Sequence, residues 1–151
     1  MKVDVFSPGK GIIKELSYFP DEVISNKDLG DGFLIELSDN NIYSPFDATV
    51  KVLYPTGHAV FLESDDGVQV MLHIGADTYK IQGINNVYTK VGVRVKQGER
   101  IIKTNVKELL KKTGSVAMAV VFLNKVNLLN LKGGIEADND TVVATIEKQN
   151  V

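Results

Sequence analysis

Short apolar runs rich in valine and isoleucine recur along the chain, and glycine, asparagine and aspartate interrupt them at intervals of about ten residues. The interruptions at residues 39–41, 65–67 and 138–140 consist of residues that tolerate turn conformations, and Gly133-Gly134 marks another turn. The pattern predicts an all-β fold, an antiparallel sandwich or barrel. The predicted strands cover residues 11–16, 32–37, 41–44, 48–54, 59–63, 69–74, 86–88, 91–93, 100–104, 117–123 and 142–147.

One segment has a different pattern and predicts a short helix. Asn105 is a favourable N-cap residue, Glu108 follows three positions later as in a capping box, and Gly114 follows the last turn. Leu109 and Leu110 give this segment an apolar face. We therefore expect one or two short helices beside the strands.

Composition narrows the class of protein. The 151 residues are enough for one domain, and we expect a single domain over residues 1–151. The net charge of -2 argues against a nucleic-acid partner. The chain has no cysteine, no apolar N-terminal leader, and no apolar run longer than residues 116–123, which is too short to cross a bilayer. These features predict a soluble, cytoplasmic protein.

The chain contains two histidines, His58 and His73, on two segments that resemble the strands of a β-hairpin. If residues 65–66 form a two-residue loop, His58 lies directly opposite His73, with Cβ atoms roughly 5 Å apart. If residues 66–67 form the loop, His73 faces Val60 and His58 lies two residues away on the same face. A three-residue loop would place the rings on opposite faces, because side chains alternate along a strand.

Two imidazoles on one face suit three kinds of chemistry. A neutral imidazole is a good nucleophile for phosphoryl carriage, and a second ring can donate a hydrogen bond to the phosphoryl oxygens. Imidazole is also a common Zn²⁺ ligand and a common proton carrier. Two ligands without a nearby third make a poor independent metal site, so we expect no intrinsic metal. A histidine on a strand is also often a partly buried polar residue without a functional role.

The sequence around both histidines is distinctive. Residues 54–59 read Tyr-Pro-Thr-Gly-His-Ala, and residues 73–78 read His-Ile-Gly-Ala-Asp-Thr. Together with residues 7–11, 19–24, 30–35, 43–50 and 95–99, these segments closely resemble the glucose-type IIA domain of the phosphoenolpyruvate:sugar phosphotransferase system. The resemblance covers nearly the whole chain and implies a β-sandwich of the duplicated hybrid motif type.

The resemblance implies roles for individual residues. His73 matches the histidine that is phosphorylated, His58 matches its partner, and Thr56 matches the hydroxyl that orients His58. Asp21 and Asp77 match acidic positions that meet an arginine of the donor. The matched apolar rim, on which partners dock, consists of Val23, Ile24, Leu29, Tyr54, Met71 and Tyr79.

The implied function is that of a phosphoryl carrier, a phosphotransferase component. His73 would accept phosphate from the histidine phosphocarrier protein and pass it to a cysteine of a sugar-specific IIB domain or a membrane IICB permease during sugar uptake. No cofactor is required beyond the transient phosphate. Physically, a shallow apolar rim would exclude water from a labile phosphohistidine while leaving the ring accessible to proteins.

Two alternatives remain open at this point. Residues 79–86 depart from the turn that is usual in the resembled family, which favours a regulatory module that docks on other proteins. In such a module, His58 and His73 could hold Zn²⁺ together with a partner's carboxylate. Residues 95–101 resemble a turn of lipoyl and biotinyl carriers, but the chain lacks a convincing lysine for modification.

Overall fold

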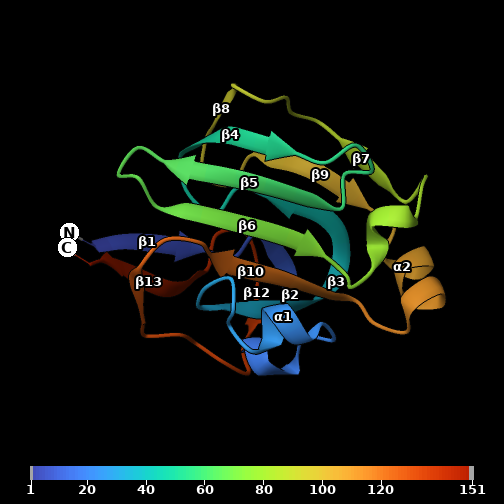
Figure 1. Ribbon diagram of the computed structural model, residues 1–151, viewed down its shortest axis with the longest axis horizontal. Coiled ribbons are helices and arrows are strands. Elements are labelled where there is room, and N and C mark those ends of the chain that lie inside the picture. The colour runs from blue at the N-terminus through green and yellow to red at the C-terminus, as the bar shows by residue number, and fades with distance from the viewer. Residues whose placement is uncertain (1, 150–151) are drawn as a thin grey trace.

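Antiparallel strands form the framework of the fold, as the computed structural model of residues 2–149 shows (Figure 1). A ten-stranded sheet has the order β12-β2-β3-β10-β6-β5-β4-β8, with β9 pairing β3 and β7, and a second sheet has the order β1-β13-β11. The strands are β1 (Lys2–Phe6), β2 (Gly9–Glu15), β3 (Gly32–Tyr43), β4 (Ala48–Leu53), β5 (Ala59–Ser64), β6 (Gln69–Ile74), β7 (Asn85–Val87), β8 (Arg94–Val95), β9 (Arg100–Thr104), β10 (Ala117–Phe122), β11 (Val126–Leu129), β12 (Glu136–Ala137) and β13 (Val142–Lys148).

The predicted all-β, antiparallel fold class is confirmed, and most predicted strands agree with the observed ones to within one or two residues. Residues 32–37 and 41–44, predicted as two strands, instead form the single strand β3. The polar residues 39–41 lie where β3 has left β10 and joins β9, with Asn41 opposite Lys103, and where its pairing with β2 is irregular. They therefore mark a change of partner rather than a turn.

Other differences concern short or peripheral strands. Residues 91–93 were predicted as a strand but form a turn, and the following Arg94–Val95 is the strand β8. The strands β1, β11 and β12 were not predicted. Two of them, β1 and β11, flank β13, and β1 is defined by pairing between the two ends of the chain.

The short helices agree with the capping pattern. In α2 (Val106–Thr113), the Asn105 side chain accepts a hydrogen bond from the backbone N–H of Glu108, and Gly114 ends the helix in the left-handed conformation. A second helix, α1 (Glu22–Ser25), begins where Asp21 accepts a hydrogen bond from Ile24 N at 3.1 Å. Two 3₁₀ turns, η1 (Leu16–Tyr18) and η2 (Thr78–Lys80), complete the helical elements.

The hydrophobic core has two parts. The larger part fills the interior between the sheets and includes Phe33, Leu72 and Phe122. A smaller cluster lies on the opposite face of β3, β6 and β10, where η1 and α1 cover the sheet: Leu16, Phe19, Ile24, Leu34, Met71, Ala117, Ala119 and Val121. Figure 1 shows α1 in front of the sheet, beside β10 and β2. Because side chains alternate along β6, His73 lies on the same face of the sheet as Met71 of this cluster.

Candidate functional site

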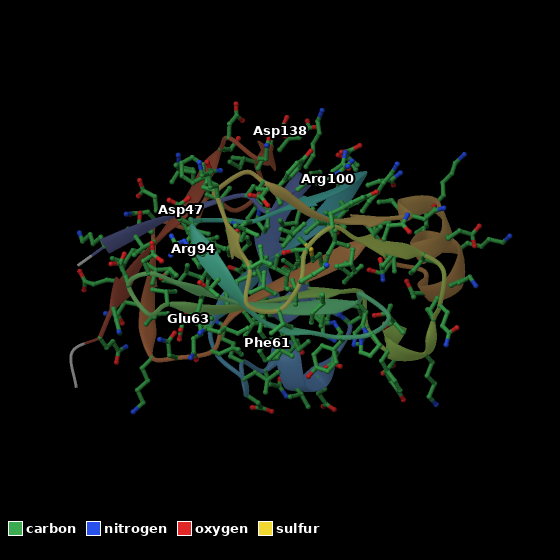
Figure 2. The ribbon with its side chains drawn as sticks, turned by 90° about the horizontal axis from the view of Figure 1, so that it is seen from above. Asp47, Phe61, Glu63, Arg94, Arg100 and Asp138 are labelled. Atoms are coloured by element: carbon green, nitrogen blue, oxygen red, sulfur yellow. The ribbon has the colours of Figure 1, made fainter. Side chains whose placement is uncertain are left out.

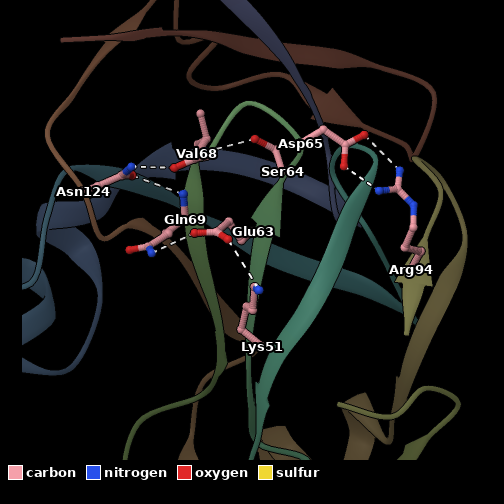
Figure 3. Close-up of polar contacts among 9 residues, drawn as sticks. Lys51, Glu63, Ser64, Asp65, Val68, Gln69, Arg94 and Asn124 are labelled. Atoms are coloured by element: carbon pink, nitrogen blue, oxygen red, sulfur yellow. Dashed lines mark hydrogen bonds and ion pairs between the residues drawn. The ribbon is translucent and has the colours of Figure 1, made fainter. Parts of the chain in front are cut away.

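The β5–β6 hairpin carries both histidine segments, and its loop has three residues, 65–67. Glu63 pairs with Gln69, and the backbone N–H of Ser64 donates to Val68 O at 2.9 Å. The Ser64 hydroxyl accepts from Val68 N at 3.0 Å, and the Asn124 amide contacts both Gln69 N and Gly67 O (Figure 3). The two Asn124 contacts come from a distant part of the chain, and together with the Ser64–Val68 contacts they fix the register of the hairpin.

The observed register corrects the predicted position of His58. Ala59, not His58, lies opposite His73, and His58 O accepts a hydrogen bond from Ile74 N at 2.7 Å. Both predictions of a two-residue loop, at residues 65–66 or 66–67, are therefore wrong. The consequence expected of a three-residue loop was wrong as well, because the rings do not lie on opposite faces. Their centroids are 5.4 Å apart, with an angle of 77° between the ring planes.

The turn before β5 explains this arrangement. His58 precedes the first residue of the strand, so strict alternation of side chains does not apply to it. Gly57 has a φ of 71°, a left-handed conformation that glycine adopts without steric cost. The turn thus redirects the His58 ring toward the face that bears His73.

His73 lies near the end of the interior strand β6, between two small residues. Its direct neighbours are Ala59 on β5 and Ala119 on β10. Their methyl side chains are too small to cover the ring, whereas the Phe19 ring meets it edge-on with centroids 6.3 Å apart. The His73 side chain therefore has defined packing and partial exposure.

The hydrogen bond of His73 determines its tautomer. Nδ1 lies 2.7 Å from the carbonyl oxygen of Gly75. Because a carbonyl oxygen only accepts, Nδ1 must carry the proton and donate. In the neutral ring the lone pair is then on Nε2, which makes Nε2 the nucleophilic nitrogen.

His58 is oriented by a hydroxyl. Its Nδ1 lies 2.5 Å from Thr56 Oγ1, and its ring centroid lies 5.1 Å from that of Tyr54. A hydroxyl can donate to Nδ1, which leaves the proton of the neutral ring on Nε2. In that tautomer His58 Nε2 is a hydrogen-bond donor for an anionic group beside His73.

Burial favours the neutral form of both rings. The pKa of His58 is lowered mainly by burial and further by the charge that His73 would carry. Burial also lowers the pKa of His73, against opposing effects of the Gly75 carbonyl and of the charges on Asp21 and Asp77. A neutral imidazole is the form that can act as a nucleophile.

Both histidines line a hollow of about 460 Å³ on the surface. All six residues of the predicted apolar rim line it: Val23, Ile24, Leu29, Tyr54, Met71 and Tyr79. Ile24 and Met71 are buried and form its floor, while the other four side chains are each at least 40% exposed. The hollow thus has an apolar, accessible border around two imidazoles.

The three remaining predicted residues have different positions. Asp21 lines the hollow, but its side chain also caps α1. Asp77 does not line it; it is exposed in the turn after β6, with a left-handed φ of 55°. Thr56 also lies outside the lining and supports His58 through its hydroxyl.

Sequence reasoning missed several residues of the site. Phe19 packs against His73, and Phe61 lines the hollow beside Tyr54, with ring centroids 5.9 Å apart. Figure 2 shows Phe61 and Glu63, two residues apart on β5, on the same side of the ribbon. The alternation along β5 could have placed Phe61 on the face of His73's neighbour Ala59. The Gly75 carbonyl has no signature in the residue pattern.

Residues 2–149 lack two types of feature. No group of three histidine, aspartate or glutamate side chains is placed to hold a metal ion there. Neither helix in this part of the chain has the length and apolar character needed to span a bilayer.

Comparison with known proteins relates this geometry to a family. Residues 3–128 match the model of the phosphoenolpyruvate-dependent sugar phosphotransferase system, EIIA 1. The fold is similar to that of glucose permease IIA from Mycoplasma capricolum, with a TM-score of 0.91, 29% sequence identity and 96% of each chain covered. On the extent of the family match, the chain belongs to the EIIA 1 family of the phosphoenolpyruvate-dependent sugar phosphotransferase system.

Proposed function

We propose that this protein is a phosphoryl carrier that accepts phosphate on Nε2 of His73 and passes it to a sugar-specific IIB domain. The observation that carries the proposal is the hydrogen bond from His73 Nδ1 to the Gly75 carbonyl. It leaves Nε2 as the nucleophile of a neutral ring in an accessible apolar hollow.

Each of the two transfer steps forms one bond to phosphorus and breaks another, and neither step needs a cofactor. The Nε2 lone pair of His73 attacks phosphorus, and the nitrogen–phosphorus bond of the phosphorylated histidine phosphocarrier protein breaks, returning its electron pair to the donor imidazole. A cysteine thiolate of the IIB domain then attacks phosphorus. The second nitrogen–phosphorus bond breaks, and its electron pair returns to His73. The phosphoryl group stays on proteins throughout, in the cytoplasm.

His58 assists by hydrogen bonding. With the Thr56 hydroxyl donating to Nδ1, the His58 Nε2–H donates to the phosphoryl oxygens and stabilises the charge that develops on them. The ring separation of 5.4 Å leaves room for this contact. We therefore expect His58 to matter more for transfer than for attachment of phosphate to His73.

The border of the hollow is the docking surface for both partners. The exposed side chains Val23, Leu29, Tyr54 and Tyr79 provide apolar contact area, and their removal from water on docking protects the phosphohistidine. Asp21 and Asp77 steer a basic donor toward the site.

Phosphorylation mapping tests the proposal. The protein is incubated with phosphoenolpyruvate, the general phosphotransferase enzyme and the histidine phosphocarrier protein, followed by a IIB domain. Wild type should carry acid-labile phosphate on His73, His73→Ala should carry none, and His58→Ala should accept phosphate but transfer it poorly. Wild type without phosphate on His73 would overturn the proposal.

A second candidate function is docking on a regulated protein through a shared zinc ion. The adjacent rings of His58 and His73 favour it, since two imidazoles need only one or two further ligands. A partner carboxylate would supply the third. Complex formation that increases with Zn²⁺ and is lost in His58→Ala would support this role, whereas zinc-independent complexes would refute it.

A further inference from the structure

Asn85, on the short strand β7, contacts the turn that carries Thr56 and His58. Its Nδ2 donates a hydrogen bond to the backbone oxygen of Thr56 at 3.1 Å. Because a carbonyl oxygen only accepts, the NH₂ group of the amide must face it. The contact joins residues 29 positions apart in the sequence.

The Asn85 side chain also packs against the same turn. A Cβ atom placed on Gly57 would lie 3.0 Å from Asn85 Cβ and 2.9 Å from Val87 Cγ2. The glycine therefore permits β7 to approach closely, in addition to providing the left-handed φ. Thr56 and Gly57, the last two residues of the tight turn before His58, thus both lie against β7.

The position of Asn85 is itself fixed by the sheet. Asn85 pairs with Thr104 on β9, and the backbone N–H of Asn105, the N-cap of α2, donates to Ile84 O at 2.8 Å. The amide of Asn85 is therefore held by a regular element rather than by a loop. A rigid support of this kind can position a neighbouring group accurately.

The polar side chain of Asn85 carries an energetic cost. Its Oδ1 is buried and has no hydrogen-bond partner among residues 2–149. A buried unpaired acceptor is unfavourable, so an apolar side chain of similar volume would be less costly for folding alone. The bond from Nδ2 to Thr56 is the one interaction that an apolar side chain could not replace.

We propose that Asn85 is a positioning residue for His58. It fixes the backbone of Thr56 and so holds the Thr56 hydroxyl where it donates to His58 Nδ1, which leaves the ring proton on Nε2 and fixes the direction of the ring. The inference rests on the proposed function, in which His58 donates to the phosphoryl group of His73. It adds a residue that acts on this transfer without contacting phosphate.

The test separates positioning from folding. Asn85→Leu removes the donor and also the unpaired acceptor, so the free energy of unfolding should be unchanged or increased. Asn85→Asp keeps the shape but places a carboxylate against the Thr56 carbonyl. Asn86→Asp introduces the same charge at the neighbouring exposed residue and is the matched control.

The first readout is nitrogen NMR of the His58 ring in the unphosphorylated protein. Wild type and Asn86→Asp should show mainly the Nε2–H tautomer, and both Asn85 variants should show a tautomer mixture. The second readout is transfer from His73 to a IIB domain, which should slow about tenfold or more in both Asn85 variants.

Unchanged His58 signals together with unchanged transfer in Asn85→Leu would overturn the inference. Transfer that is normal in Asn85→Leu and equally slow in Asn85→Asp and Asn86→Asp would also overturn it, because charge alone would then explain the effect. Failure of wild type to take phosphate would instead refute the proposed function, while the NMR readout would still report on the contact between Asn85 and Thr56.

Discussion

The Nδ1 atom of His73 and the carbonyl oxygen of Gly75 lie 2.7 Å apart, so the backbone just after β6 holds the ring from behind. This bond predicts that phosphate attaches to Nε2. Long-range proton–nitrogen NMR of the phosphorylated protein distinguishes the two ring nitrogens. Phosphate on Nδ1 would require the Gly75 bond to break and would contradict the assignment.

Replacement of Gly75 should disturb both the fold and the nucleophile. Gly75 has a φ of 69°, and an added Cβ would lie 2.7 Å from Thr78 Cγ2 and 3.0 Å from Leu109 Cδ1. We expect Gly75→Ala to lower the free energy of unfolding by on the order of 3 kcal/mol and to slow phosphorylation of His73.

The matched control for this variant is Gly83→Ala. Gly83 also has a positive φ, of 84°, but its added Cβ would meet nothing within 4 Å. The cost should be about 1 kcal/mol, from the backbone alone. Equal losses in the two variants, measured by urea unfolding, would show that crowding at Gly75 is unimportant.

Protein stability should fall as the pH decreases below the ordinary histidine range. Burial lowers the pKa of both His58 and His73 from the usual value of 6.5, so the unfolded chain binds more protons in this window. The free energy of unfolding is therefore highest above pH 6.5 and decreases until the pH is below the folded pKa values. Urea unfolding from pH 8 to pH 5 measures this slope.

The double variant His58→Gln/His73→Gln provides the control for this pH dependence. It lacks both imidazoles, so the decrease just below pH 6.5 should be much smaller. Glu63 and Asp65 have lowered pKa values too, through Gln69 and Arg94 respectively, and they titrate at lower pH. An unchanged slope in the double variant would assign the effect to other groups.

Asp21→Asn separates two roles of one residue. Asparagine is about as good an N-cap as aspartate, so the bond to Ile24 N and the stability of α1 should persist. The charge is lost, so the pKa of His73 should decrease further and association with a basic donor should slow. Association rates at low and high salt measure this. If the association rates of the variant and of wild type change with salt to the same extent, Asp21 does not steer the donor.

The regular parts of this fold could be predicted from local sequence. The strands β6 and β9 begin and end at the predicted residues, because apolar runs with clear turn residues on both sides leave little choice. The same holds for α2, whose caps Asn105 and Gly114 are local signals. The strand β1 was missed because it is stabilised by pairing with β13, at the other end of the chain.

The geometry of the site could be predicted only in part. Residues 65–67 are compatible with several loops, and the register depends on Asn124, which lies far away in the sequence. The approach of His58 to His73 depends on the turn at Gly57 rather than on strand alternation. The rim residues were identified through the resemblance, because exposed and buried apolar side chains look alike in a sequence.

The position of His73 between Ala59 and Ala119 has a consequence for the order in which partner proteins bind. The ring is anchored in an interior strand, so it cannot swing from one binding partner to another. In the proposed relay, donor and acceptor must therefore bind one after the other to the same surface around His73. A partner that binds there without exchanging phosphate would act as a competitive inhibitor. The rate of phosphate transfer through the protein would then depend on the dissociation rate of each partner.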